Sequence, residues 1–169
     1  PELQKKYTWL DFLIKKDMKQ LSHEMEVSIQ AGDIVGLLYN AFLKQYGIPD
    51  TIPKKETAEE KAKREHKLRS LNALCVRLVF CLYAEDAGIF GRHGMFHDYL
   101  AGYSVKDSRR ALIELFRVLD TPIAERDEYL EAELAQFPYV NGGLFADESI
   151  EIPQFNAEIR ALILERASE

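Results

Sequence analysis

The segment from Leu68 to Gly88 constrains this sequence most, because it is apolar on nearly every side for five helical turns. Its apolar residues recur at steps of three and four, and a second set makes the opposite helix face apolar as well. A helix of this kind requires neighbours all round. We therefore predict a buried central helix that ends at Gly88, since glycine readily adopts the left-handed conformation that terminates helices.

The residues before this segment predict that the central helix begins much earlier. Thr57 and Glu60 form a capping-box pattern, in which each side chain accepts a hydrogen bond from the backbone of the other residue. Acid-before-base pairs four residues apart follow: Glu59 with Lys63, Glu60 with Arg64, and Glu65 with Arg69. We expect one helix over about 58–87, roughly 45 Å long, with a solvated first half and a buried second half.

Shorter amphipathic helices are expected on both sides of the central helix. Thr8 starts one and Asp33 caps another, whereas Pro49 and Pro53 make 48–56 a linker. Later in the chain, the pattern predicts a short helix between Gly94 and Gly102, a helix capped by Ser104 and Asp107, a polar helix within 126–136, and a last helix capped by Asn156. Phe137 to Phe145 reads as extended chain around a tight glycine turn.

The predicted fold class is therefore mainly α, a helical bundle around a central buried helix (about 58–87) with a short extended Gly-Gly turn segment near 137–152. We expect a single helical domain over 1–169: N-terminal helices in 1–47, a linker in 48–56, central helices in 57–136, and the turn segment with a C-terminal helix in 137–169. Pro1 is not an initiator methionine, so we interpret the chain as a fragment of a larger protein.

Composition narrows the function classes. A net charge of -6 and a pI near 5.3 argue against a protein whose whole surface binds nucleic acid, although a local basic face remains open. Cys75 and Cys81 lie six residues apart among apolar neighbours, which predicts buried free thiols and suits a reducing compartment. There is no secretory signal, and the wholly apolar run is too short to cross a bilayer, so we expect a cytoplasmic protein without membrane contact.

Catalytic and metal-binding patterns are weak. His93 and His97 lie four apart with Asp98, Glu85 and Asp86 near in sequence, but glycines flank or interrupt the pair, and surface or half-buried histidines are the better interpretation. Acids at a helix C-terminus oppose the helix dipole, so an arginine such as Arg77 or Arg92 is expected to pair with Glu85-Asp86.

The glycine pair Gly142-Gly143 lacks the remaining parts of a phosphate loop, which favours a tight turn packed by Phe137, Tyr139, Leu144 and Phe145. We predict no catalytic, cofactor-binding or metal-binding residue in this chain.

Basic residues cluster in two places that could contact a DNA backbone by charge attraction. The first cluster contains Lys63, Arg64 and Lys67 and is interleaved with glutamates, which favours a solvated helix face. The second contains Lys106, Arg109 and Arg110, has fewer acids nearby, and is the better candidate.

Three segments together resemble the helical spacer region of MmeI-like enzymes, the type IIG restriction-modification proteins, and of related adenine-specific DNA methylases. They are SIQAGDIVGLLYNAFLKQY at 28–46, LRSLNALCVRLVFCLYAEDAGIF at 68–90 and FPYVNGGLF at 137–145. The resemblance implies a bacterial defence protein in which a nuclease domain, which uses Mg, precedes the helical connector. It also implies a methyltransferase domain that uses S-adenosylmethionine after the connector, and DNA contact through the parent protein.

The motifs of the family's active sites are absent from this sequence. Phe137-Pro138-Tyr139 lacks the Asn-Pro start of an Asn-Pro-Pro-Tyr motif, and no glycine-rich cofactor loop or nuclease motif occurs. The first hypothesis is thus a non-catalytic helical spacer that fixes the geometry between nuclease and methyltransferase, with DNA-backbone contact. The alternative is a free-standing helical interaction module that binds a partner protein through an exposed apolar groove. A small metal-dependent hydrolase built on His93 and His97 ranks below both.

Overall fold

The computed structural model describes residues 34–167, and helices account for all the regular structure in that range. No strand occurs there, so the predicted mainly α class is confirmed. The predicted helix near Thr8 and the Asp33 cap lie outside the described residues. The elements are α3 (Ile34–Tyr46), α4 (Ala58–Asp86), α5 (Met95–Ala101), α6 (Ser108–Leu119), the 3-10 turn η1 (Ile123–Glu125), α7 (Ala132–Ala135) and α8 (Ala157–Ala167).

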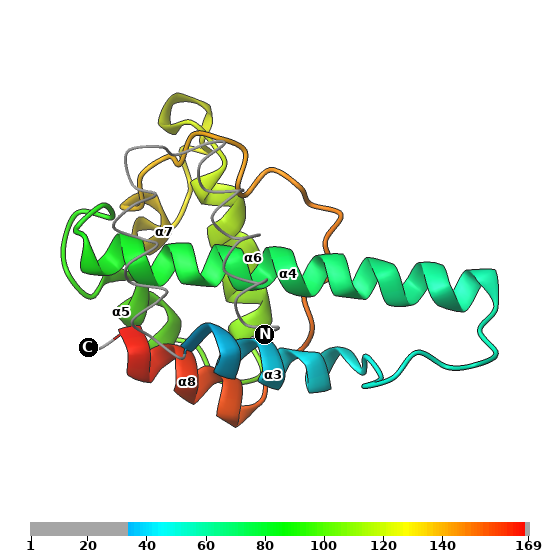
Figure 1. The fold of residues 1–169 in the computed structure, drawn as a ribbon. Helices are drawn as coiled ribbons and strands as arrows, with labels where there is room; N and C mark the ends of the chain where they lie inside the picture. The colour runs from blue at the N-terminus through cyan, green and yellow to red at the C-terminus, as the bar shows by residue number, and fades with distance from the viewer. Residues whose placement is uncertain (1–33, 168–169) are drawn as a thin grey trace.

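Helix α4 is the long central helix, and both of its ends form as predicted (Figure 1). At its start, Glu60 N–H donates to Thr57 Oγ1 at 3.1 Å, and Thr57 N–H donates to Glu60 Oε2 at 3.0 Å. At its end, Gly88 takes a φ of 74° and Ile89 N–H donates to the Ala84 carbonyl at 2.9 Å. These bonds satisfy backbone groups that every helix terminus leaves open.

The two halves of α4 differ in their surroundings. The first half, here called the arm (residues 58–67), is exposed or half-buried and extends past the body of the molecule beside α3 and the connector 48–56 (Figure 1). The second half is buried continuously from Val76 to Glu85. Burial on all sides is the arrangement that the all-round apolar pattern requires.

Helices α3 and α8 pack side by side along one side of α4 (Figure 1). The rings of Phe42 and Phe155 meet edge to face with centroids 5.5 Å apart. Asn156 Nδ2 donates to Gln45 Oε1 at 3.3 Å, and the Tyr46 hydroxyl donates to the Glu151 carbonyl. The end of α3 is therefore joined to the segment that leads into α8 by both apolar and polar contacts.

Two predicted helix caps and one predicted helix that follow α4 in the chain can be compared with the structure. Asn156 caps α8, because its Oδ1 accepts the Ile159 N–H at 2.8 Å. The prediction of a cap by Ser104 and Asp107 is wrong: Asp107 precedes α6 but makes no side-chain cap bond, because its carboxylate accepts the Ser104 hydroxyl instead. The predicted helix within 126–136 forms only over the four residues of α7.

The glycine segment makes the predicted turn with one difference in packing. Gly142 and Gly143 have φ of 116° and 78°, values that L side chains rarely adopt. Phe137 and Phe145 are buried as expected, but Tyr139 is 38% exposed. Val140 is buried in its place and donates its N–H to the Leu119 carbonyl at 2.8 Å.

Both cysteines are buried free thiols, as predicted, and burial raises the pKa of Cys81. Within residues 34–167, no helix is long and apolar enough to span a bilayer.

Candidate functional site

The first basic cluster lies on the arm, and its charges are largely engaged within the protein. Arg64 donates from Nε and Nη2 to the two oxygens of Glu56 at 2.8 and 3.2 Å, with both side chains largely buried. Lys67 Nζ donates to the Tyr46 carbonyl at 3.1 Å. Lys63 pairs with Glu59 at 3.2 Å, as predicted, and keeps 72% of its side chain exposed.

The predicted pair between Glu60 and Arg64 is wrong for a simple reason. The Glu60 carboxylate accepts the Thr57 N–H in the capping box, whereas Glu56 lies where it can receive both donors of the guanidinium. The hydrogen bond from Arg64 lowers the pKa of Glu56. The bidentate pair fastens the end of the connector onto α4.

An open hollow of about 460 Å³ separates the connector from the arm. Ile48, Pro49 and Pro53 form its apolar wall, and the three bases of the first cluster form much of the other wall. Of the three bases of the first cluster, Lys63 is the one with a strongly exposed ammonium group on this hollow, and Lys55 of the connector is an exposed base on its other side.

The second basic cluster lies at the start of α6. Arg109 Nε donates to the Ile152 carbonyl and so joins α6 to the segment before α8. Arg110 is paired loosely with Asp107 at 3.7 Å and is 64% exposed, and Lys106 is exposed just before the helix. The two clusters lie on different helices, and each has one or two charges that remain available to an outside anion.

Arg77 has a structural role that differs from the predicted pairing with Glu85-Asp86. It is 3% exposed, and it donates to the carbonyls of Leu144 at 3.1 Å and Asp147 at 2.8 Å. Its guanidinium carbon lies 5.2 and 5.7 Å from the ring centroids of Phe116 and Phe145. Burial lowers the pKa of Arg77. An arginine within an otherwise apolar run was the available signal, because a buried guanidinium requires acceptors for its donors.

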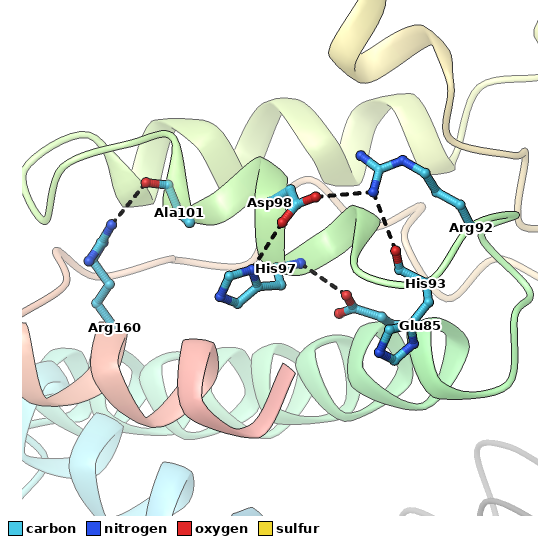
Figure 2. A network of polar contacts seen from close by, with 7 residues as sticks. All are labelled: Glu85, Arg92, His93, His97, Asp98, Ala101 and Arg160. Carbon is cyan, nitrogen blue, oxygen red and sulfur yellow. Dashed lines mark hydrogen bonds and ion pairs between the residues drawn. The ribbon is translucent and has the colours of Figure 1, made fainter. Parts of the chain in front are cut away.

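The histidines and acids near the end of α4 form a polar network in place of the predicted ion pair (Figure 2). Glu85 is 1% exposed, and its Oε1 accepts the His97 N–H at 3.3 Å. Arg92 Nη1 lies 3.0 Å from Asp98 Oδ2, and His97 Nδ1 lies 3.1 Å from Asp98 Oδ1. Glu85 therefore pairs with neither Arg77 nor Arg92, contrary to the prediction.

Glu85 instead accepts a backbone donor in the first turn of α5, where the N–H groups have no partner within the helix. Its Oε2 is buried and has no hydrogen-bond partner. Burial is the main cause that raises the pKa of Glu85. Among the described residues, no group of three or more His, Cys, Asp or Glu is arranged to hold a metal ion.

These observations define a helical module that is organised around one long helix and stabilised by polar contacts to backbone carbonyls. Three comparisons place it more closely. Residues 69–145 match the family model described as MmeI, helicase spacer domain. DNA methyltransferase A of Bacillus subtilis (strain 168) is 31% identical over 159 residues, which is 91% of this chain and 16% of that protein.

The solved structure of the type IIL restriction-modification enzyme MmeI in complex with DNA matches with a TM-score of 0.63 and 31% identity. The match covers 82% of this chain and 16% of the MmeI chain. The chain is therefore an MmeI-like spacer region, and it spans about one sixth of the length of these two relatives.

The family match covers the buried half of α4 together with α5, α6 and α7, but it includes neither α3 nor α8. It includes Arg77, Glu85 and the second basic cluster, but it starts after Lys63, Arg64 and Lys67. The part of the chain that matches the family model thus contains most of the buried half of α4 together with α6.

Proposed function

We propose that this chain is the non-catalytic helical spacer of an adenine-specific DNA methyltransferase that uses S-adenosylmethionine, within a restriction-modification protein of the cytoplasm. We further propose that it folds as one domain and holds the methyltransferase at a fixed geometry to a nuclease domain that uses Mg. The observation that carries the proposal is the 31% identity of the chain, over 91% of its length, to DNA methyltransferase A. The MmeI enzyme in complex with DNA supports it through a similar fold.

The packing of α3 on α8 gives this role a physical basis. The second half of α3 and the segment that leads into α8 are held together by the Phe42–Phe155 ring contact and the Asn156–Gln45 hydrogen bond. Both helices also rest on α4, which is capped at both ends. Because packed interiors resist deformation, domains attached to these two helices would keep a constant separation and orientation.

Contact with the DNA backbone is the finer part of the proposal. Lys106, Arg110 and Lys63 extend into solvent and are suited to phosphate oxygens. Arg64, Lys67 and Arg109 donate to acceptors within the protein, so they would add only local positive potential. We therefore assign direct contact mainly to Lys106 and Arg110.

An assay of methyl transfer tests the proposal that the parent protein is an adenine-specific DNA methyltransferase. The natural polypeptide that contains this segment is incubated with DNA and labelled S-adenosylmethionine, and adenine methylation is measured together with the distance between the recognition site and any cleavage site. We expect methylation of DNA adenine and one sharp cleavage distance. Absence of methyl transfer to DNA would remove the assignment.

Two variants test the proposal that the spacer fixes the separation of the nuclease and methyltransferase domains. Phe155→Ala removes the ring contact between α3 and the start of α8, and Asn156→Ala removes both the hydrogen bond to Gln45 and the cap of α8. Both should broaden the distribution of cleavage distances while methylation changes little. An unchanged, sharp distance in both variants contradicts a spacer role for this interface.

Salt dependence tests the DNA contact. Lys106→Ala with Arg110→Ala should lower the slope of log affinity against log salt by about 1 to 2, since each lost phosphate contact contributes about 0.9. Lys54→Ala in the exposed connector is the matched control and should leave the slope unchanged. Equal slopes for both variants would exclude α6 from the interface.

A further inference from the structure

Two large apolar side chains are displayed on the loop that follows α6. Tyr129 is 84% exposed and Ile123 is 69% exposed, the highest values among the large apolar residues of the described chain. Figure 1 shows this loop on the far side of the molecule from α3 and α8. A single exposed apolar residue is ordinary, but two within seven residues on one loop require an explanation.

The same loop holds most of the chain's excess negative charge. Residues 120–133, here called the acidic loop, contain six acidic side chains and one arginine, and so account for five of the six net negative charges. Five of the acids are exposed, and none of them forms an ion pair within the described part of the chain. They are Glu125, Asp127, Glu128, Glu131 and Glu133.

The single arginine holds the loop in one conformation. Arg126 donates to the carbonyls of Val118 at 2.9 Å, Thr121 at 3.0 Å and Phe137 at 2.7 Å. These bonds join the end of α6 to Phe137, just after α7, across the base of the loop. Near the tip, Asp127 Oδ1 accepts the Tyr129 N–H at 2.9 Å. An ordered loop loses little conformational entropy on binding, which is the property of a preorganised contact surface.

We propose that the acidic loop is a docking surface for a positively charged protein surface. Ile123 and Tyr129 enter apolar hollows of that partner, and the surrounding carboxylates face its lysines and arginines. Tyrosine is enriched among residues that dominate interface energies, and complementary charge speeds encounter and fixes the orientation of the partners. DNA is excluded as the occupant because its phosphates would meet the carboxylates.

The charge surroundings of Ile123 can be compared with those of a second isoleucine. Ile52 in the connector is 68% exposed, nearly the same as Ile123, but lies beside Lys54 and Lys55. It therefore provides a control of equal apolar exposure and opposite local charge.

Site-specific photo-cross-linking in the natural polypeptide tests the proposal. The photoreactive residue p-benzoyl-L-phenylalanine replaces Tyr129, or Ile123 in a second variant, or Ile52 as the control. Cross-linked peptides are then identified by mass spectrometry with and without DNA. The yield is compared at about 0.15 M and 0.5 M salt, and in a Glu125→Lys/Glu128→Lys background.

We expect both loop positions to cross-link to one segment of net positive charge in another part of the same polypeptide, because this chain is about one sixth of the length of its relatives. The yield should fall at least about threefold at high salt and in the lysine background. Ile52 should not reach that segment. The proposal would be overturned by cross-links only within residues 34–167, to a separate polypeptide, to DNA, or to a neutral or acidic segment. A yield that does not respond to salt would also overturn it. Neither S-adenosylmethionine nor DNA is required, so this result is independent of the methylation assay.

Discussion

In the arm of α4, side chains are exposed or half-buried, and the first turns of the helix are supported by local interactions: the Thr57–Glu60 capping box and the Glu59–Lys63 pair. In the second half of the same helix, Val76 to Glu85 are buried and tertiary contacts surround the backbone. A cap contributes about 1 kcal/mol and an exposed pair a few tenths, whereas one buried aromatic side chain contributes several. The comparison shows that packing fixes where α4 lies, and local signals set how far it extends.

The largest expected effect on stability comes from a substitution in the buried half of α4. Phe80 is 1% exposed and its ring lies 6.4 Å from that of Phe90 and 5.7 Å from that of Phe145. Phe80→Ala should lower the free energy of unfolding by about 3–5 kcal/mol, through lost burial and a residual cavity. Urea denaturation measures the change, with Lys61→Ala in the arm as the control. Similar midpoints for the two variants would contradict the proposed difference between the halves.

The second prediction compares the stability cost of removing a buried arginine with that of removing an exposed arginine on the same helix. Arg77→Ala leaves the Leu144 and Asp147 carbonyls without their donor and should cost about 3 kcal/mol. Arg69→Ala, at an exposed position, should change stability by less than about 0.5 kcal/mol. Hydrogen exchange should also show faster opening around Gly142 and Gly143 in Arg77→Ala alone. Equal costs for the two variants would show that the buried contacts of Arg77 are unimportant.

An effect of intermediate size concerns the charge at the end of the buried half. Burial raises the pKa of Glu85, so the folded state binds this proton more tightly than the unfolded state. The stability linked to that proton is fully present below the ordinary pKa of 4.5 and is lost as pH rises through the folded pKa. Glu85→Gln cannot ionise and keeps an oxygen for the His97 N–H.

The variant should therefore gain stability relative to the parent as the pH rises from 4.5 towards neutrality. Chemical denaturation over this pH range measures the difference between the two proteins, which cancels contributions from other carboxylates. A difference that stays constant with pH, or that shrinks as pH rises, would contradict the assignment of a buried, poorly compensated carboxyl group.

The smallest effect concerns the arm. Thr57→Ala removes the acceptor for the Glu60 N–H and should cost about 1 kcal/mol. The loss should appear as faster hydrogen exchange in the first turn of α4, with the second half unchanged. Thr51→Ala in the connector is the matched control and should have little effect. Loosening of the whole helix by Thr57→Ala would show that the two halves are not supported independently.

Local signals were enough to predict the helices that carry this fold. The capping box, the apolar pattern and Gly88 gave the limits of α4 within a residue, and Asn156 gave the start of α8, because each acts over a few neighbouring residues. The partners of charged side chains could not be predicted in the same way. Arg77 contacts carbonyls 67 and 70 positions later, and no pattern within the helix encodes them.

Competition between nearby side chains for the same hydrogen-bond partners explains the remaining differences between the predictions and the structure. Arg64 had Glu60 at helical spacing, but the cap occupied Glu60 and Glu56 was free to receive the guanidinium. The sequence also indicated a polar helix within 126–136, whereas the Arg126 side chain donates to carbonyls of the surrounding chain and only the four residues of α7 are helical. For the DNA-contact residues, the sequence predicted the clusters but not which charges would be satisfied within the protein.

The central claim is that this spacer keeps the domains on either side of it at one separation. The most direct measurement is the distance distribution between two spin labels in the natural polypeptide, one in the domain before the spacer and one in the domain after it. The account predicts a single narrow distance that broadens in Phe155→Ala and stays narrow in Tyr139→Ala, since Tyr139 is partly exposed and lies outside the α3–α8 contact. A broad distribution in the unmodified protein, or no response to Phe155→Ala, would contradict it.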